Sequence, residues 1–228
     1  MGKLKLEKNT YNGIERHDIL FLLTYFFIFE IIGLFAFMLI YMFLPLNESY
    51  LDLLYEFSFY AVLTGMGISF YKKDLISCFN KFKKHWFKII LILLGITVLD
   101  TYLEYFMDII FKLPTPENQE MLNEAFMEFP IFESITTVIF APFIEELVFR
   151  HILIGKLSGT ISTIGAAIIS IVLFAFVHSG FSLSFLSYIT GSIILALIYI
   201  KSGKNVVVSI SYHVIWNLLA TITMISLI

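Results

Sequence analysis

The stretch TISTIGAAIISIVLFAFVH, residues 160–178, carries no aspartate, glutamate, lysine or arginine and decides the fold class. A membrane-spanning helix needs about 20 mostly apolar residues, and this run has that length. Six more apolar segments accompany it, and in lipid only helices or closed barrels satisfy the backbone. The alternating pattern of barrel strands is missing from the sequence, so we predict helices. The seven segments are 19–44, 53–71, 87–110, 131–157, 160–178, 183–200 and 205–226.

The composition supports the same class. Of the 228 residues, 59% are hydrophobic and 14% are charged. In soluble domains, about 45–50% of the residues are apolar and roughly 25% are charged. This balance excludes a soluble enzyme, a nucleic-acid-binding domain and a disordered chain. The single cysteine, Cys78, excludes an intrachain disulfide. Since no repeat or long linker divides the sequence, we predict one all-α transmembrane domain, residues 1–228, with about seven helices.

The basic residues predict how these helices are oriented. Seven spans place 14 of the 15 lysines and arginines on the side of the N-terminus and leave only Lys112 opposite. The positive-inside rule makes the lysine-rich side cytoplasmic, with the N-terminus inside and the C-terminus outside. The many phenylalanine, isoleucine and lysine residues are typical of an AT-rich bacterium. We therefore expect a multi-pass protein of a bacterial plasma membrane.

A short amphipathic stretch, 117–129, lies on the predicted outer side. It follows two prolines and is expected to form a helix, for which two interpretations stay open. One is an interfacial helix on the outer leaflet, and the other is a lid over an opening between the spans. Its apolar face consists of Met121, Leu122, Ala125, Phe126 and Phe129.

The third segment carries three acidic residues at a spacing of four. Asp100, Glu104 and Asp108 stack on one face of a helix because residues four apart lie above one another. Charged groups at membrane depth are costly and usually face a bundle interior or a wet cavity. The three carboxylates therefore mark either an outer helix end that reaches water or the polar wall of an aqueous cavity.

A second group of polar residues comes from the fourth, fifth and seventh segments. With a rise of 1.5 Å per residue, four of its members, one glutamate (Glu145), both histidines and the asparagine, come to similar depths near the middle of the membrane. Within the group, Glu146 and Arg150 have the spacing of a favoured ion pair, and Glu145 points about 100° away. Pro142 loosens the helix one turn earlier because it lacks an N–H. The group consists of Glu145, Glu146, Arg150, His178, His213 and Asn217.

These residue types fit the activation of a water molecule. A carboxylate takes a proton as general base, and a histidine orients the water or protonates the leaving group. The spacing of His213 and Asn217 lets both address one substrate atom, and a donor to a developing oxyanion is worth about 3–4 kcal/mol. The sequence therefore predicts hydrolytic chemistry at mid-membrane depth.

Three motifs resemble the CAAX-protease and bacteriocin-processing (CPBP, or Abi) intramembrane proteases. They are the EExxxR of Glu145–Arg150, the FxxxH of Phe174–His178 and the HxxxN of His213–Asn217. The resemblance covers about residues 130–220. It implies an endopeptidase in which Glu145 and His178 activate the water, His213 and Asn217 stabilise the oxyanion, and Glu146 and Arg150 support the site.

Metal dependence stays open in this resemblance, although we favour a site without metal. The alternative is a zinc ion held by Glu145, His178 and His213, with Glu146 as the base. One residue departs from the family pattern, because His151 stands where glycine is usual. We expect it to narrow access to the site or to change the pH dependence.

The expected partners are a peptide or membrane-protein substrate and the lipid bilayer, without nucleic acid. In bacterial relatives the resemblance suggests bacteriocin self-immunity or the maturation of secreted peptides. Two other functions stay open: a non-catalytic protein that sequesters a peptide or regulates a partner, and a proton-coupled transporter that uses the face of Asp100.

Overall fold

A computed structural model describes residues 9–43, 47–114 and 117–226, and every regular element in these residues is a helix. The predicted all-α class is confirmed. Lys3, Lys5 and Lys8 lie outside the described residues. In chain order, with η1 to η3 π-helical and η4 a 3₁₀ turn, the elements are α1 (Arg16–Leu23), η1 (Thr24–Gly33), α2 (Leu34–Phe43), α3 (Glu48–Lys83), α4 (Trp86–Phe111), α5 (Glu117–Glu128), α6 (Pro130–Ile135), η2 (Thr136–Phe140), α7 (Ala141–Glu145), η3 (Glu146–Lys156), η4 (Leu157–Gly159), α8 (Thr163–Ser179), α9 (Phe185–Lys201) and α10 (Val206–Ser226).

Several of the described helices are long and apolar enough to cross a membrane. Three meet this test alone, namely Ser49–Lys83, Trp86–Phe111 and Val206–Ser226. The pair Arg16–Ile28 and Ile31–Phe43, bent by 49°, makes a fourth if it is one span, and α8 and α9 are shorter apolar helices. These helices indicate a multi-pass membrane protein. The predicted count of seven spans and the orientation stay predictions.

Helix α3 is longer than the apolar segment 53–71 that predicted it. Its N-terminus is capped by Asn47, whose side chain accepts a hydrogen bond from the Ser49 N–H at 3.2 Å. Its other end runs on to Lys83, through charged residues that the prediction assigned to a loop. Lysine favours water but is also a good helix former, and the run 68–83 contains no glycine or proline to end the helix.

The centre of the fold is η3, in which all residues from Glu146 to Lys156 are buried. It packs against α1, α7, α8, α9 and α10. Within this core the rings of Phe149 and Phe174 meet edge to face at 5.0 Å, an arrangement that aromatic pairs prefer. A helix buried on every side is stabilised by packing all round, so its polar residues must find their partners inside the protein.

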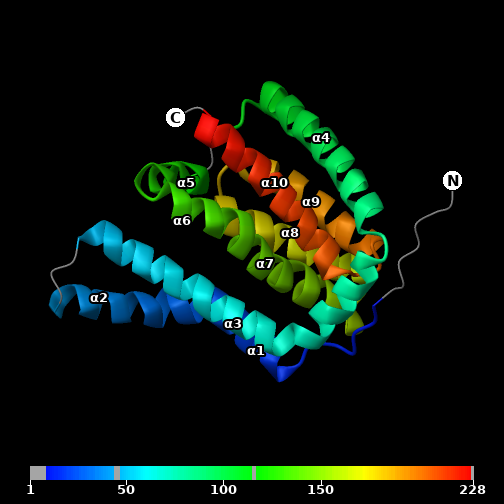
Figure 1. Ribbon diagram of the computed structural model, residues 1–228, viewed down its shortest axis with the longest axis horizontal. Coiled ribbons are helices and arrows are strands. Elements are labelled where there is room, and N and C mark those ends of the chain that lie inside the picture. Colours follow the sequence, from blue (N-terminus) through cyan, green and yellow to red (C-terminus); the bar gives the residue numbers. More distant parts are fainter. Residues whose placement is uncertain (1–8, 44–46, 115–116, 227–228) are drawn as a thin grey trace.

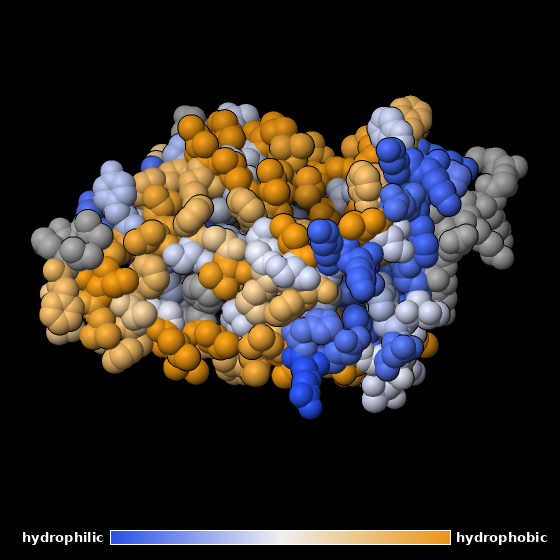
Figure 2. All heavy atoms as spheres, turned by 60° about the horizontal axis from the view of Figure 1, so that its bottom comes forward, coloured by the Kyte–Doolittle hydropathy of each residue, from blue (hydrophilic) through white to orange (hydrophobic). Residues whose placement is uncertain are grey.

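The two ends of the helix assembly differ in character. The end of α3, the start of α4 and the start of α10 lie together on the right of Figure 1, whereas α5, α6 and the end of α10 lie toward the left. Figure 2 shows hydrophilic side chains in a band toward the right-hand end of that view, with hydrophobic side chains over most of the rest. Broad apolar surface of this kind is typical of contact with lipid.

Candidate active site

The carboxylate of Glu145 lies between two histidines that come from different helices. Its Oε1 is 3.6 Å from His178 Nε2, near the end of α8, and its Oε2 is 3.7 Å from His213 Nε2, on α10. His178 Nδ1 is 2.9 Å from the carbonyl oxygen of Phe174. A carbonyl only accepts, so Nδ1 carries a proton, and a neutral His178 turns the lone pair of Nε2 toward Glu145.

The neighbouring Glu146 is fully buried and contacts the Nδ1 side of the His213 ring, opposite the Nε2 that faces Glu145. Its Oε1 is 3.1 Å from His213 Nδ1 and 3.3 Å from an Nη of Arg150, and Ser209 donates its hydroxyl hydrogen to Oε2. The predicted ion pair between Glu146 and Arg150 is present. Because the carboxylate accepts the proton of Nδ1, Glu146 fixes the orientation of the imidazole and directs Nε2 toward Glu145.

Arg150 is also fully buried and connects this cluster to the FxxxH motif. One Nη donates to the Ser192 hydroxyl at 3.1 Å, and the guanidinium carbon lies 4.5 Å from the centroid of the Phe174 ring. The same ring stacks on His178, with centroids 4.3 Å apart and planes 23° apart. Phe174 therefore positions His178 through its ring and its carbonyl oxygen, while also packing on Arg150.

Asn217 lies one turn beyond His213 on α10 and caps a carbonyl in η2. Its Nδ2 donates to the Thr137 carbonyl oxygen at 2.8 Å. In η2 the Ala141 N–H bonds to the carbonyl five residues earlier, so the same register would pair Thr137 with Pro142. Proline has no N–H, and the carbonyl of Thr137 is left for the Asn217 side chain. The loosening expected at Pro142 thus takes the form of a carbonyl that a neighbouring helix satisfies.

A pocket of about 780 Å³ opens beside Glu145. The other expected residues in its wall are His178, His213 and Asn217, whereas Glu146 and Arg150 are not among the lining residues. The six expected site residues therefore form two layers, four facing the pocket and two packed behind them.

Two other expectations concern the walls of this pocket. Asp100 and Glu104 both line it, which favours the polar wall of a cavity over a helix end in water. The side chain of Asp108 lies outside the described part. Residues of α5, including the fully buried Phe126, also line the pocket. This position favours the interpretation of α5 as a cover over an opening between the helices.

His151 lies away from the pocket, contrary to the expectation that it narrows access. Its Nε2 is 3.1 Å from Asp74 Oδ2, and its ring meets Tyr11 and Tyr71 edge to face at 5.0 and 4.9 Å. Tyr11 precedes α1, and burial raises the pKa of its phenol, so it remains a neutral partner. His151 therefore fills the interior between η3, α3 and the N-terminal segment.

Truncating this side chain should consequently affect stability and not catalysis. We expect His151→Ala to lower the free energy of unfolding by about 2–5 kcal/mol, as for other large buried side chains. Peptide hydrolysis and its pH profile should stay unchanged. Thermal unfolding in detergent and a pH–rate profile check this, and a faster reaction or an altered profile in the variant would place His151 on the access path after all.

The described residues contain no group of three or more histidine, cysteine, aspartate or glutamate side chains arranged to hold a metal ion. Glu145, His178 and His213 thus do not form the three-ligand shell of the zinc alternative. Glu146, the base of that alternative, already interacts with His213, Arg150 and Ser209. The geometry does not support the zinc arrangement.

Three supporting residues were not predicted from the sequence. Ser192 comes from α9, which carries none of the three motifs, so no pattern marks it. Ser209 precedes His213 by one turn and shares its face of α10, and this spacing is a signal that could have identified it. Thr137 contributes only its backbone, which no residue type encodes.

Comparison with known proteins places the resemblance on the C-terminal part of the chain. Residues 127–219 match the family model described as "Type II CAAX prenyl endopeptidase Rce1-like", and all three motifs lie within them. The resemblance inferred from the motifs is confirmed over this segment. The UPF0177 protein YvdC of Lactococcus lactis subsp. lactis (strain IL1403) is 35% identical over 114 residues, which are 50% of this chain and 43% of that protein. The chain thus spans less than half the length of this relative. No solved structure matches the chain.

Proposed function

We propose that the chain is an intramembrane endopeptidase that hydrolyses a peptide bond in a small or membrane-anchored peptide. The observation that carries this proposal is the placement of Glu145 between the Nε2 atoms of His178 and His213 at the wall of a pocket. The match to an endopeptidase family over residues 127–219 supports the same reaction class.

In the proposed first step Glu145 acts as general base toward a substrate water. The separations of 3.6 and 3.7 Å exceed a direct hydrogen bond, and a water can bridge polar groups at such distances. His178 accepts one hydrogen of that water at Nε2, while Glu145 takes the other as the oxygen attacks the peptide carbonyl carbon. Positioned general bases contribute about 10²–10⁴-fold to rates.

The proposed second step expels the leaving amine. His213, in its protonated form, donates from Nε2 to the oxyanion and keeps Nδ1–H on Glu146, and Asn217 donates its remaining amide hydrogen. Each such donor is worth about 3–4 kcal/mol in the transition state. When the tetrahedral intermediate collapses, the carbon–nitrogen bond breaks and the amine takes the proton from Glu145. Arg150 keeps Glu146 in place throughout.

The proposed setting is a bacterial plasma membrane, crossed seven times with the N-terminus inside. The lysine-rich end of α3 and the hydrophilic band in Figure 2 support the orientation, since both lie toward one end of the helix assembly. Peptide maturation or self-immunity against a bacteriocin would be the physiological role of such an activity.

The test is peptide mass spectrometry of cells that carry the wild type or Glu145→Gln. We expect cleaved peptides with the wild type and only their uncleaved precursors with the variant. Glu128→Gln removes an exposed carboxylate from α5 and serves as the control, which should behave like the wild type. If immunity survives in a well-expressed Glu145→Gln protein that cleaves no peptide, the protease function is wrong and a peptide-binding function replaces it. If processing itself survives, the proposed hydrolysis through Glu145 is wrong.

A further inference from the structure

A second, smaller pocket adjoins the catalytic carboxylate. It has a volume of about 160 Å³ and shares four wall residues, Tyr60, Ala141, Glu145 and His178, with the larger pocket. The residues that line only the larger pocket include parts of α4, α5, α9 and α10, whereas those that line only the small one come from η1, α3, α7 and α8. Glu145 and His178 therefore lie where two pockets meet. The residues of the small pocket alone are Tyr25, Phe59, Ile144 and Val177.

Apart from the two catalytic groups, the lining of the small pocket is aromatic or aliphatic. Tyr25, Phe59 and Tyr60 supply three aromatic rings. Among the described residues, no lysine, arginine or aspartate contributes to the wall. Ligand pockets are typically lined by hydrophobic and aromatic side chains with a small number of polar groups that fix orientation. The lining therefore suits an uncharged, apolar group that lies next to the hydrolytic centre.

The volume of the small pocket matches a single aromatic ring. An apolar cavity of about 150 Å³ lined by leucine, isoleucine and phenylalanine side chains is large enough to bind benzene. The small pocket, with about 160 Å³, can therefore hold the ring of a phenylalanine side chain. The indole of tryptophan adds a second fused ring, for which this volume leaves no room. The size of the pocket thus selects one class of side chain.

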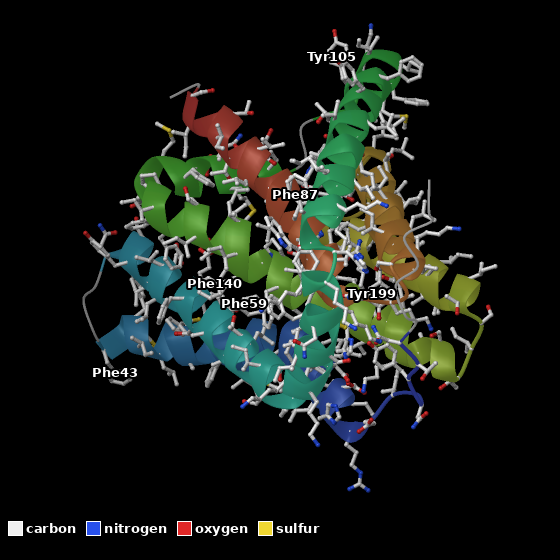
Figure 3. The ribbon with its side chains drawn as sticks, turned by 45° about the vertical axis from the view of Figure 1, so that its right-hand side comes forward. Phe43, Phe59, Phe87, Tyr105, Phe140 and Tyr199 are labelled. Atoms are coloured by element: carbon white, nitrogen blue, oxygen red, sulfur yellow. The ribbon has the colours of Figure 1, made fainter. Side chains whose placement is uncertain are left out.

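The aromatic wall of the small pocket is anchored to the core of the fold. The ring of Tyr25 meets the buried Phe149 of η3 edge to face at 5.9 Å and lies 6.0 Å from the ring of Phe59. Phe59 in turn meets Tyr60 at 5.5 Å, and Tyr60 packs on Phe140 at 6.2 Å. Figure 3 shows Phe59 and Phe140 close together, where α3 contacts η2 and α7. A wall that is already ordered before binding reduces the entropic cost of holding a ligand.

We propose that the small pocket is a specificity subsite, which binds the side chain of a phenylalanine next to the cleaved bond of the peptide substrate. This inference rests on the proposed protease function and adds its substrate class. An endopeptidase holds residues on both sides of the bond that it cleaves, and the two pockets that meet at Glu145 give each side a place. An aromatic side chain fits better than an aliphatic one, because aromatic rings gain stabilisation from edge-to-face contacts in addition to burial. Tyr25, Phe59 and Tyr60 precede the segment 127–219, so the N-terminal helices supply this specificity to the family-matched part.

Binding of designed peptides tests this subsite without requiring hydrolysis. Full-length protein carrying Glu145→Gln is titrated in detergent with fluorescent serine–alanine peptides that contain one phenylalanine, one tryptophan or only alanine. We expect the phenylalanine peptide to bind about tenfold more tightly than the alanine peptide, equivalent to about 1.4 kcal/mol. Adding Val177→Phe should fill the pocket and abolish this preference. Val172→Phe is the matched control, because both valines lie on α8 and are 44–45% exposed but only Val177 lines the pocket, so the preference should persist. Phe59→Ala should enlarge the pocket and let the tryptophan peptide bind at least as tightly as the phenylalanine peptide.

A tenfold preference that persists in the Val177→Phe protein would overturn the subsite. Equal binding of the phenylalanine and alanine peptides without Val177→Phe would also overturn it and would indicate a pocket that holds only water. If Val177→Phe does not fold, Phe59→Ala decides, and an unchanged order of phenylalanine over tryptophan would contradict the subsite. Hydrolysis separates this proposal from the previous one. A wild type that prefers the phenylalanine peptide but cleaves no peptide would contradict the protease function alone, and a wild type that cleaves the phenylalanine and alanine peptides with equal kcat/KM would contradict the subsite alone.

Discussion

Replacing Glu145 by glutamine is expected to lower kcat for peptide hydrolysis by about 10²–10⁴-fold, the contribution of a positioned general base. Glutamine keeps the size and hydrogen-bonding capacity of the side chain but cannot take a proton from water. Glu145 faces both histidines across 3.6 and 3.7 Å, while Glu146 is held by Arg150 and Ser209. Single-turnover hydrolysis of a peptide identified by mass spectrometry measures the effect.

The same assay decides the metal question. Glu128→Gln should retain the wild-type rate, and a melting temperature close to that of the wild type would show that Glu145→Gln is folded. We expect chelators to leave the rate unchanged. Stoichiometric zinc in the purified protein, with activity lost on chelation and restored by zinc, would contradict the arrangement derived from Glu145, His178 and His213.

Replacing Arg150 by methionine should strongly lower the free energy of unfolding. Removing one partner of a buried ion pair typically costs about 3–5 kcal/mol because the other charge stays buried without compensation. Here that charge is Glu146, whose side chain is 0% exposed, and the change also removes the guanidinium from the face of Phe174. Thermal unfolding of detergent-solubilised protein should show a clearly lower transition temperature.

A double variant separates the charge effect from a loss of packing. Glu146→Gln with Arg150→Met removes both charges at similar volume, so we expect it to unfold at a higher temperature than Arg150→Met alone. Because Glu146 orients His213, the double variant should regain stability but remain slow in hydrolysis. Equal melting of Arg150→Met and the wild type would show that Glu146 has another means of compensation.

Much of this architecture follows from local sequence patterns. Apolar segments predicted the helical class, because a lipid-exposed backbone has few alternatives. The spacing of Glu146 and Arg150 predicted their pairing, because residues four apart meet on any helix. The end of α3 was not predicted. Polar residues indicate where a segment leaves the membrane, but they do not end a helix, and α3 continues through its lysine-rich part to Lys83.

The parts that were not predicted depend on contacts between helices. The segment 87–110 is apolar on most sides, so its periodicity could not reveal whether Asp100 faces the pocket or water. Packing of α4 against α10 decides this through Tyr212. His151 likewise has no local signature of its role, because Asp74 and Tyr11, its partners, come from distant parts of the chain.

The π-helical register around Pro142 has a consequence for protein engineering. The freed carbonyl of Thr137 and the amide of Asn217 form one unit with the change of helix type at Glu145 and Glu146. A designer who grafts only the motif side chains onto an ideal α-helical scaffold would rotate the glutamates away from the two histidines. A functional graft must therefore carry the backbone irregularity from Thr136 to Lys156 together with the segment of α10 that accommodates it.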